Sequence, residues 1–261
     1  MKLKVYVVNA FAESSFGGNP AAVISLREWL TEDLMQQIAM QHNLAETAFI
    51  VPQENDYAIR WFTPAVEVAL CGHATLASAH IFYNYLGYRN DKITFHSKSG
   101  PLHVSKKADG RLTLDFPADD AKETASIPEI ENGLKIKPLE VYKGTTDYMV
   151  VLENQQAIES LDPDFRILAE LRSRGIIATA KGEETDFVSR CFFPQSGIDE
   201  DPVTGSAHTL LAPFWAKKLG KEKLTAIQLS KRKGFLECEM KADRVLISGN
   251  ARTYLEGEIY I

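Results

Sequence analysis

The stretch GHATLASAHIFYNYLG, from Gly72 to Gly87, is apolar on nearly every side when it is wound as a helix. A helix that is apolar all round is stable only when it is buried. A second stretch of the same length, GSAHTLLAPFWAKKLG from Gly205 to Gly220, also runs from a glycine to Leu-Gly. We therefore predict one buried helix in each half of the chain. Pro213 lies inside the second helix and is expected to kink it, because proline removes a backbone donor.

The segments around these two helices repeat in the same order. Three further pairs match: RWFTP (60–64) with RCFFP (190–194), ETAFI (46–50) with ETDFV (184–188), and ITFHSKSG (93–100) with IQLSKRKG (227–234). The period is about half the chain, far longer than the roughly 20 to 50 residues of solenoid repeats. This pattern predicts a duplicated domain, with an N-terminal half at 1–118, a C-terminal half at 119–261 and an active site at their interface.

Alternation of apolar and polar residues predicts strands in each half, separated by short glycine-containing turns. In the first half they are Val5 to Asn9, Thr47 to Val51, Ala58 to Phe62, Ile93 to Ser97, Leu102 to Lys106 and Leu112 to Phe116. Residues 31–43 have the apolar spacing of an outer amphipathic helix. Short hairpin connections favour antiparallel or mixed sheets, so we expect an α+β fold.

Composition restricts the classes of partner and compartment. The formal net charge of −6 disfavours nucleic acid or an anionic membrane as the main partner. Three cysteines without a Cys-x-x-Cys motif predict neither a disulfide framework nor a structural zinc site. No apolar run is long enough for a signal peptide or a membrane span. These features predict a cytoplasmic soluble protein.

The two glycine-initiated helices predict where a small ligand binds. The first amides of a helix have no intrahelical partner and carry a partial positive charge. Glycine at the start lets a ligand approach closely, because no side chain blocks the amides. We therefore expect Gly72 with His73, and Gly205 with Ser206, to face one shared crevice and to bind a substrate carboxylate there.

The candidate catalytic residues lie where the two halves differ. Cys71 and His73 flank the first glycine, whereas Thr204 and Ser206 flank the second, and only the second half carries the acidic insertion that contains Asp201. Each residue taken alone also has an ordinary structural interpretation: Asp201 as a helix cap, His73 as a hydrogen-bonded core histidine, and Ser206 as a simple helix residue.

Glu46 stands alone among apolar neighbours where the outer helix gives way to a strand. It either caps or pairs with an arginine, or it is a desolvated carboxylate that passes protons near neutral pH. Asn19 in FGGNPAAV likewise has two interpretations, an ordinary turn residue or a hydrogen-bond partner of the ligand.

Four motifs, FGGNPAAV, AETAFI, WFTPAVEVALCGHATLASAH and DEDPVTGSAH, together resemble the PhzF-like family, named for the phenazine-biosynthesis isomerase. The resemblance implies a diaminopimelate epimerase-like α+β fold, with two pseudo-symmetric halves that each wrap a curved mixed or antiparallel sheet around a central helix. It implies that Glu46 shuttles a proton, that His73, Asp201 and Ser206 assist, that no metal or organic cofactor is needed, and that the protein is a homodimer.

Related epimerases and proline racemases place a pair of cysteines directly before the two helix glycines. Here these places hold Cys71 and Thr204, and a threonine hydroxyl is a poor proton-transfer base. The pattern favours a cofactor-independent isomerase in which Glu46 moves the proton, with Asn19, Gly72, Thr204 and Gly205 as substrate-binding residues. Two alternatives stay open: a racemase, epimerase or dehydratase that uses Cys71 at Cα, and a non-catalytic metabolite-binding or interaction protein.

Overall fold

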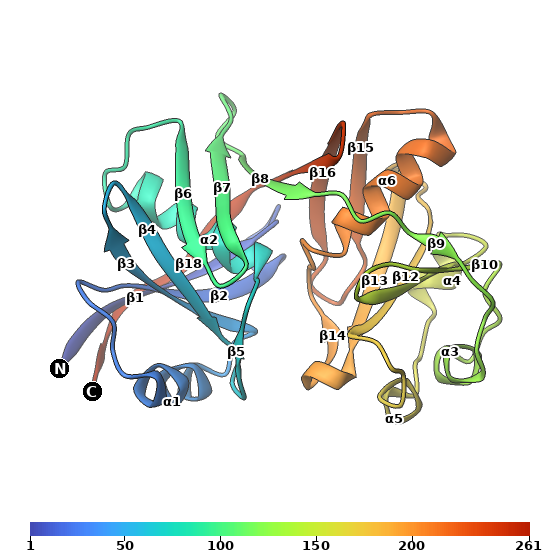
Figure 1. Cartoon of the computed structure of the whole chain (residues 1–261), viewed down its shortest axis with the longest axis horizontal. Helices are drawn as coiled ribbons and strands as arrows, with labels where there is room; N and C mark the ends of the chain where they lie inside the picture. The colour runs from blue at the N-terminus through green and yellow to red at the C-terminus, as the bar shows by residue number, and fades with distance from the viewer. The chain divides into compact units, whose positions relative to one another are not determined.

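A computed structural model describes all residues from 1 to 261. The chain forms two compact units: unit 1 comprises Met1–Asp115 and Ser248–Ile261, and unit 2 comprises Phe116–Ile247. The expected halves, 1–118 and 119–261, differ from these units at the C-terminus. The last strand, β18 (Ala251–Tyr260), pairs antiparallel with the first, β1 (Lys2–Ala10), so both chain ends lie together in unit 1 (Figure 1).

Unit 1 contains a mixed sheet. Its remaining strands are β2 (Asn19–Ser25), β3 (Glu46–Gln53), β4 (Asp56–Phe62), β5 (Glu67–Val68), β6 (Lys92–Ser97), β7 (Gly100–Lys106) and β8 (Leu112–Pro117). β1 and β2 are antiparallel, β2 and β3 parallel, β3 and β4 antiparallel, β4 and β6 parallel, and β6 to β8 antiparallel. The six strands predicted in this half are confirmed, each extended by a few residues at its ends.

Two helices cover this sheet. Helix α2 (Gly72–Asn84) contacts β1, β2, β3, β7 and β18, and all of its residues except His80 and Asn84 are buried. It is the central helix that the apolar stretch predicts. Helix α1 (Glu32–His42) packs on β3 and β4 through Met35, Ile38 and Ala39. Thr31 is the N-cap of α1, and its side chain accepts a hydrogen bond from the amide of Leu34. The amphipathic helix predicted at 31–43 is thus confirmed.

Unit 2 repeats this arrangement with additional helices. Its strands are β9 (Lys122–Glu123), β10 (Glu140–Lys143), β11 (Asp147–Val151), β12 (Gly175–Lys181), β13 (Phe187–Phe193), β14 (Ile198–Asp201), β15 (Lys223–Gln228), β16 (Gly234–Lys241) and β17 (Arg244–Gly249). The pairings β10–β11, β11–β12, β12–β13, β13–β15 and β15–β16 have the same directions as their counterparts from β1 to β7. The fold is therefore α+β with two pseudo-symmetric halves.

The helices of unit 2 are α3 (Pro128–Leu134), α4 (Gln155–Glu159), α5 (Phe165–Leu168) and α6 (His208–Leu219), with a short 3-10 turn at Pro194–Ser196. Helix α6 packs on β15 and β16 and corresponds to α2. It begins later than predicted, because Gly205–Ala207 form a tight turn in which the amide of His208 donates to the carbonyl of Gly205 at 3.0 Å. The helix continues through Pro213 to Leu219.

Two of the sequence matches between the halves are wrong. ETAFI lies in β3, whereas Glu184 of ETDFV lies in the loop that joins β12 to β13. The match of 93–100 with 227–234 is displaced by three residues over the first strand, because the β15–β16 connection is longer than the β6–β7 connection.

The strand registers identify the true counterpart of Glu46. In the β3–β4 hairpin, the phenylalanine of RWFTP faces the residue after Glu46. In the β12–β13 hairpin, the first phenylalanine of RCFFP faces the residue after Gly175. The position that carries a carboxylate in unit 1 is therefore a glycine in unit 2, and Arg174 directly precedes it.

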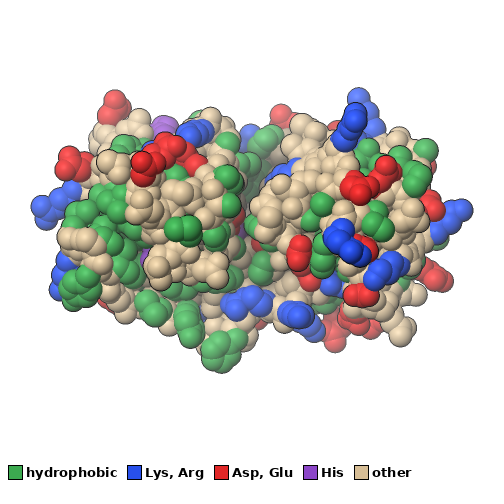
Figure 2. All heavy atoms as spheres, turned by 90° about the horizontal axis from the view of Figure 1, so that it is seen from below, with side chains coloured by type: hydrophobic (Ala, Val, Ile, Leu, Met, Phe, Trp, Pro, Cys, Tyr) green, Lys and Arg blue, Asp and Glu red, His purple; other side chains and the backbone are tan.

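No helix in the structure is long and apolar enough to cross a membrane. Figure 2 shows basic and acidic side chains scattered over the surfaces of both units.

Candidate active site

Glu46 and His73 form a buried pair in unit 1. Glu46 is the first residue of β3, and His73 is the second residue of α2, which packs against that strand. The carboxylate oxygen Oε2 of Glu46 lies 3.0 Å from Nε2 of His73, and both residues are buried. The fold thus brings together a carboxylate and an imidazole that are distant in sequence.

The other face of the His73 ring contacts Asn19 and Cys71. The amide of Asn19 lies 3.2 Å from Nδ1, and Sγ of Cys71 lies 3.6 Å from the same atom. Asn19 is held at the start of β2 by Gly18, whose φ is +70° and where a Cβ would lie 2.3 Å from the carbonyl oxygen of Ala10. Only glycine fits there. GGNP is thus a turn that also delivers Asn19 to this cluster.

The electrostatics favour a charged histidine. Burial disfavours the imidazolium, but interactions with Cys71 and Glu46 outweigh it and raise the pKa of His73 well above its ordinary value. We attribute this to Glu46, because Cys71 is a neutral thiol near neutral pH. An imidazolium donates from both nitrogens, and the Asn19 amide can turn its oxygen or its nitrogen toward Nδ1, so it serves either protonation state.

Cys71 is poorly suited to act as a base. Burial, followed by the charge of Glu46, raises the pKa of its thiol to about 11. The residue occupies the N-cap position of α2, and its side chain makes no capping hydrogen bond. A helix start can lower a thiol pKa, but here desolvation dominates. Cys71 is therefore a protonated thiol at neutral pH.

Glu46, Cys71 and His73 are all residue types that bind metal ions, and one ligand atom from each lies within 4.8 Å of the others. Glu46 contacts Nε2 of the ring, however, while Cys71 contacts Nδ1. The two side chains thus lie toward opposite ring nitrogens, whereas a metal ion binds one of them. Glu46 and Cys71 thus contact opposite nitrogens of the imidazole rather than surrounding one point as ligands would.

Backbone amides complete the cluster in unit 1. The amides of Gly72 and His73 make no hydrogen bond within the chain, and the first one donated by an α2 backbone amide to a carbonyl is from Thr75 to Cys71. These amides carry the partial positive charge of the helix start. They lie beside the Glu46 and His73 pair, where an anionic group of a ligand can accept from them.

The predicted residues of unit 2 form a separate hydrogen-bonded network. The Thr204 hydroxyl donates to Oδ2 of Asp201 at 2.5 Å, and the amide group of Gln228 bridges both residues. Both Asp201 and Thr204 are buried. Asp201 therefore does not cap α6 directly but holds the Thr204-Gly205 segment that precedes it. Gln228, the last residue of β15, was not identified from the sequence.

Ser206 contacts a residue that sequence reasoning missed. Its Oγ accepts a hydrogen bond of 3.0 Å from Nη1 of Arg174. Arg174 is held in turn by Asp147, which accepts from Nε and from Nη2. Burial disfavours the guanidinium charge, but Asp147 outweighs it and raises the pKa of Arg174 above its ordinary value. The parallel pairing of β11 with β12 creates this contact, and no local motif signals it.

The structure thus collects the predicted residues into two clusters. Glu46, His73, Asn19, Gly72 and Cys71 lie together in unit 1. Asp201, Thr204, Gly205 and Ser206 lie together in unit 2. The expectation that both helix starts face one crevice stays a prediction.

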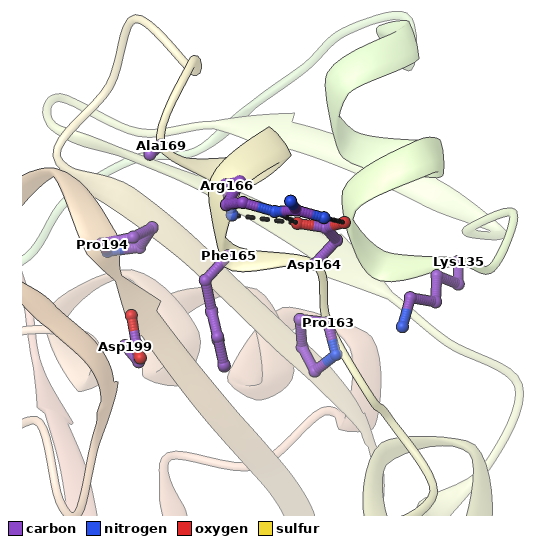
Figure 3. Close-up of a pocket in the computed structure, with 8 residues that line it drawn as sticks. All are labelled: Lys135, Pro163, Asp164, Phe165, Arg166, Ala169, Pro194 and Asp199. Carbon is purple, nitrogen blue, oxygen red and sulfur yellow. Dashed lines mark hydrogen bonds and ion pairs between the residues drawn. The ribbon is translucent and has the colours of Figure 1, made fainter.

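An open pocket of about 590 Å³ also lies in unit 2 (Figure 3). None of the predicted site residues lines it. Arg166 in its wall pairs with Asp164, and Lys135 pairs with Asp162. Both of its cationic side chains are therefore paired with carboxylates, and it lacks the buried titratable groups found beside α2.

Comparisons with known proteins place this geometry in context. A model of the family "phenazine biosynthesis-like protein" matches residues 8–257. An uncharacterized isomerase of Pseudomonas aeruginosa is 48% identical over 259 residues, which cover 99% of each chain. A crystal structure of a PhzF family phenazine biosynthesis protein from Enterococcus faecalis is 47% identical, with a TM-score of 0.96 over 100% of both chains.

A more distant likeness concerns the fold alone. A hydroxyproline epimerase from Agrobacterium vitis, crystallised with trans-4-hydroxy-L-proline, has a TM-score of 0.67 at 8% identity. It covers 99% of this chain and 92% of that one. The two pseudo-symmetric halves are therefore those of the epimerase-like fold.

Proposed function

Because the chain belongs to the phenazine biosynthesis-like protein family, we propose that it is a cofactor-independent isomerase that moves a proton on a small carboxylate-bearing metabolite. The observation that carries this proposal is the buried contact of 3.0 Å between Glu46 and His73 beside the unpartnered amides of α2. A carboxylate and an imidazole paired in this way are general acid/base groups, and the adjacent amides suit an anionic substrate.

In this mechanism Glu46 removes a proton from a substrate carbon and returns it to another carbon on the same face. The positively charged ring of His73, 3.0 Å from Glu46, orients the carboxylate, while Asn19 holds the other ring nitrogen. The amides of Gly72 and His73 bind the substrate carboxylate. Fixed N–H dipoles also stabilise the negative charge that develops on the substrate as the proton leaves.

Unit 2 holds the remaining predicted residues. Asp201 holds Thr204 through the hydroxyl bond of 2.5 Å and thereby sets the position of Gly205 and Ser206. We assign to Gly205 and Ser206 the binding of an anionic group, with Asp201 and Thr204 positioning them. The shared order of strand pairings supports an origin by internal duplication. A homodimeric state is part of the same proposal.

A second enzymatic candidate uses Cys71 as the base at Cα, as a racemase, epimerase or dehydratase would. The epimerase-like fold favours considering it. The raised pKa of the thiol, about 11, weighs against it, and so does Thr204 in the place where a second thiol would stand. This candidate requires that proton exchange disappear when the thiol is removed.

A third candidate is a metabolite-binding or interaction protein without catalysis. Such a protein needs the anion-binding amides but has no use for a proton-transfer carboxylate next to them. The buried Glu46 is the feature that weighs against this candidate, because burying a carboxylate requires compensation from its partners.

The test is hydrogen exchange in heavy water, followed by proton NMR over a panel of small amino, hydroxy and unsaturated acids. For any acid that the wild-type chain labels, Glu46→Gln should reduce labelling about 10³-fold, because the general base is lost. Glu184→Gln is the matched control, since the same change falls in an exposed loop, and it should label as wild type does. Equal labelling by Glu46→Gln and wild type would refute the proposed role of Glu46.

A further inference from the structure

Arg174 is the unexpected residue at the start of β12. Three carboxylate-bound arginines, Arg60, Arg190 and Arg174, use Nε and Nη2 in the same two-point manner. Arg60 and Arg190 are equivalent residues of the Arg-x-Phe-x-Pro motif, paired with Glu67 and Glu200. Arg174 has no such equivalent, because its counterpart in unit 1 is an alanine.

The partners of Nη1 show how Arg190 and Arg174 differ. Nη1 of Arg190 donates to the backbone carbonyls of Ile158 and Leu161. The guanidinium of Arg190 therefore stabilises the backbone of unit 2. Nη1 of Arg174 instead donates to the hydroxyl of Ser206, at the start of the helix. Arg174 therefore directs its charge toward the predicted site rather than toward the scaffold.

The clamp around Arg174 is asymmetric. The Asp147 side chain is 5% exposed, whereas that of Arg174 is 36% exposed. The ring centre of Phe193 lies 4.9 Å from Cζ of Arg174 and supports the face of the guanidinium. The carboxylate is thus buried behind a fixed cation that solvent still reaches. Such a cation is pre-organised for an anion, because its side chain has little freedom left to lose.

Donors remain available around this cation. A guanidinium has five N–H groups, of which Asp147 takes two and Ser206 takes one. Because Ser206 accepts from Arg174, its own hydroxyl hydrogen is free to donate to another group. The amides of Gly205, Ser206 and Ala207 make no hydrogen bond within the chain. Together these donors match the planar oxygens of a carboxylate.

We propose that Arg174, held by Asp147, is the anion-recognition residue of unit 2 and binds a carboxylate of the substrate together with the Ser206 hydroxyl. Unit 1 places Glu46, the first residue of β3, beside His73. Unit 2 has Gly175 at the position equivalent to Glu46, and the residue before it, Arg174, lies beside Ser206. The side chain near the start of the strand is therefore anionic in unit 1 and cationic in unit 2. The inference rests on the proposed function, which makes the ligand a substrate. It adds that Arg174 and Ser206 recognise a carboxylate group of that substrate.

The test is binding of malonate to the full chain by isothermal titration calorimetry, with uncharged malonamide as the matched probe. Arg174→Gln should weaken malonate binding about tenfold or more, because a charge-assisted hydrogen bond is lost. Arg174→Lys should restore part of the affinity, since it keeps a cation but not the planar fork. Arg166→Gln is the control, because the same change falls on a side chain that is 93% exposed, and it should bind as wild type does.

A second measurement keeps the proposal testable if Arg174→Gln does not fold. In nitrogen-15 NMR spectra of the wild-type chain, malonate should shift the Nε–H signal of Arg174 and the amide of Ser206, and Ser206→Ala should weaken binding several-fold. Absence of malonate binding to the wild type, equal binding by Arg174→Gln, or shifts confined to other residues would each overturn the proposal.

This outcome is separable from that of the proton-transfer proposal. Binding of malonate does not require Glu46, so Glu46→Gln should retain the dependence on Arg174 even if no acid is labelled in heavy water. Labelling that survives in Glu46→Gln would remove the proposed mechanism while leaving the anion site of unit 2 in place.

Discussion

The starts of α2 and α6 share one backbone device but surround it with different chemistry. In unit 1 the hydroxyl of Thr75 donates to the carbonyl of Cys71 at 2.5 Å, one turn earlier. In unit 2 the ring of His208 makes the same contact with the carbonyl of Thr204 at 2.9 Å. In both halves the side chain four residues after the one that precedes the glycine hydrogen-bonds to that residue's carbonyl and stabilises the first turn. This side chain is a threonine in unit 1 and a histidine in unit 2.

Around this shared turn the two units hold different kinds of side chain. Unit 1 gathers groups that exchange protons, the Glu46 and His73 pair. Unit 2 gathers groups that keep one protonation state near neutral pH, such as the Thr204 hydroxyl, the Gln228 amide and the Arg174 guanidinium. In the proposed function the two halves of the fold are specialised differently, unit 1 for proton transfer and unit 2 for anion recognition.

The largest effect expected from this comparison is at Gly175, the counterpart of Glu46. A Cβ there would lie 2.4 Å from the carbonyl oxygen of Phe192 and 2.2 Å from Cδ1 of Phe193. Unit 2 therefore has no space for a carboxylate at the start of β12. We expect Gly175→Ala to lower the free energy of unfolding by about 3 kcal/mol or more, because the strand backbone must shift.

Urea denaturation of the full chain measures this difference. Gly257→Ala is the control, because a Cβ at Gly257 meets only an ordinary contact of 3.5 Å, and it should change stability by less than about 1 kcal/mol. A Gly175→Ala variant as stable as the control would mean that the glycine is not what prevents unit 2 from carrying its own carboxylate.

A second, smaller effect concerns the back-bonding residues of the helices. Burial lowers the pKa of His208 to about 4 from an ordinary 6.5, so the folded chain keeps the ring neutral between these values while the unfolded chain takes up a proton. Stability should therefore fall as the pH decreases from 6.5 to 4, by up to roughly 3 kcal/mol from this residue.

His208→Thr installs the back-bonding residue of unit 1 in unit 2. The hydroxyl can make the contact that Thr75 makes, but it does not titrate, so the loss of stability between pH 6.5 and 4 should be smaller than in wild type. Denaturation midpoints of both chains across this range give the comparison. Other groups titrate in the same window, including His80 with a pKa lowered to about 4, so only the difference between chains is informative. Parallel curves would contradict the assignment.

The pattern of apolar residues was sufficient to predict the buried helix in unit 1. Eleven residues of α2 are buried, and its sequence has no continuous polar face. The strands followed from alternation. The candidate site residues came from the sequence one by one, but the contact between Glu46 and His73 depends on the packing of α2 against β3, which a single sequence does not specify.

Unit 2 was harder to predict for physical reasons. ETDFV shares three of its five residues with ETAFI, yet it begins in the loop between β12 and β13. The sequence match therefore paired Glu46 with Glu184 instead of Gly175. The pair of Arg174 and Asp147 forms because β11 and β12 are parallel neighbours joined by a long connection. Partners so separated leave no periodic signal, and the helix start after Gly205 shifted because a tight turn replaces its first residues.

The smallest expected effect decides between the two candidate bases. Cys71→Thr gives the start of α2 the residue that precedes the glycine of unit 2, and it removes the thiol without removing a hydrogen-bonding group. The backbone of Cys71, with φ −145° and ψ 112°, is the extended conformation that a threonine N-cap adopts, so the fold should tolerate the change. Because the thiol has a pKa of about 11 and is protonated at neutral pH, labelling in heavy water should change by less than about threefold. A loss of labelling as large as that expected of Glu46→Gln would instead make Cys71 the base and place proton transfer on the thiol.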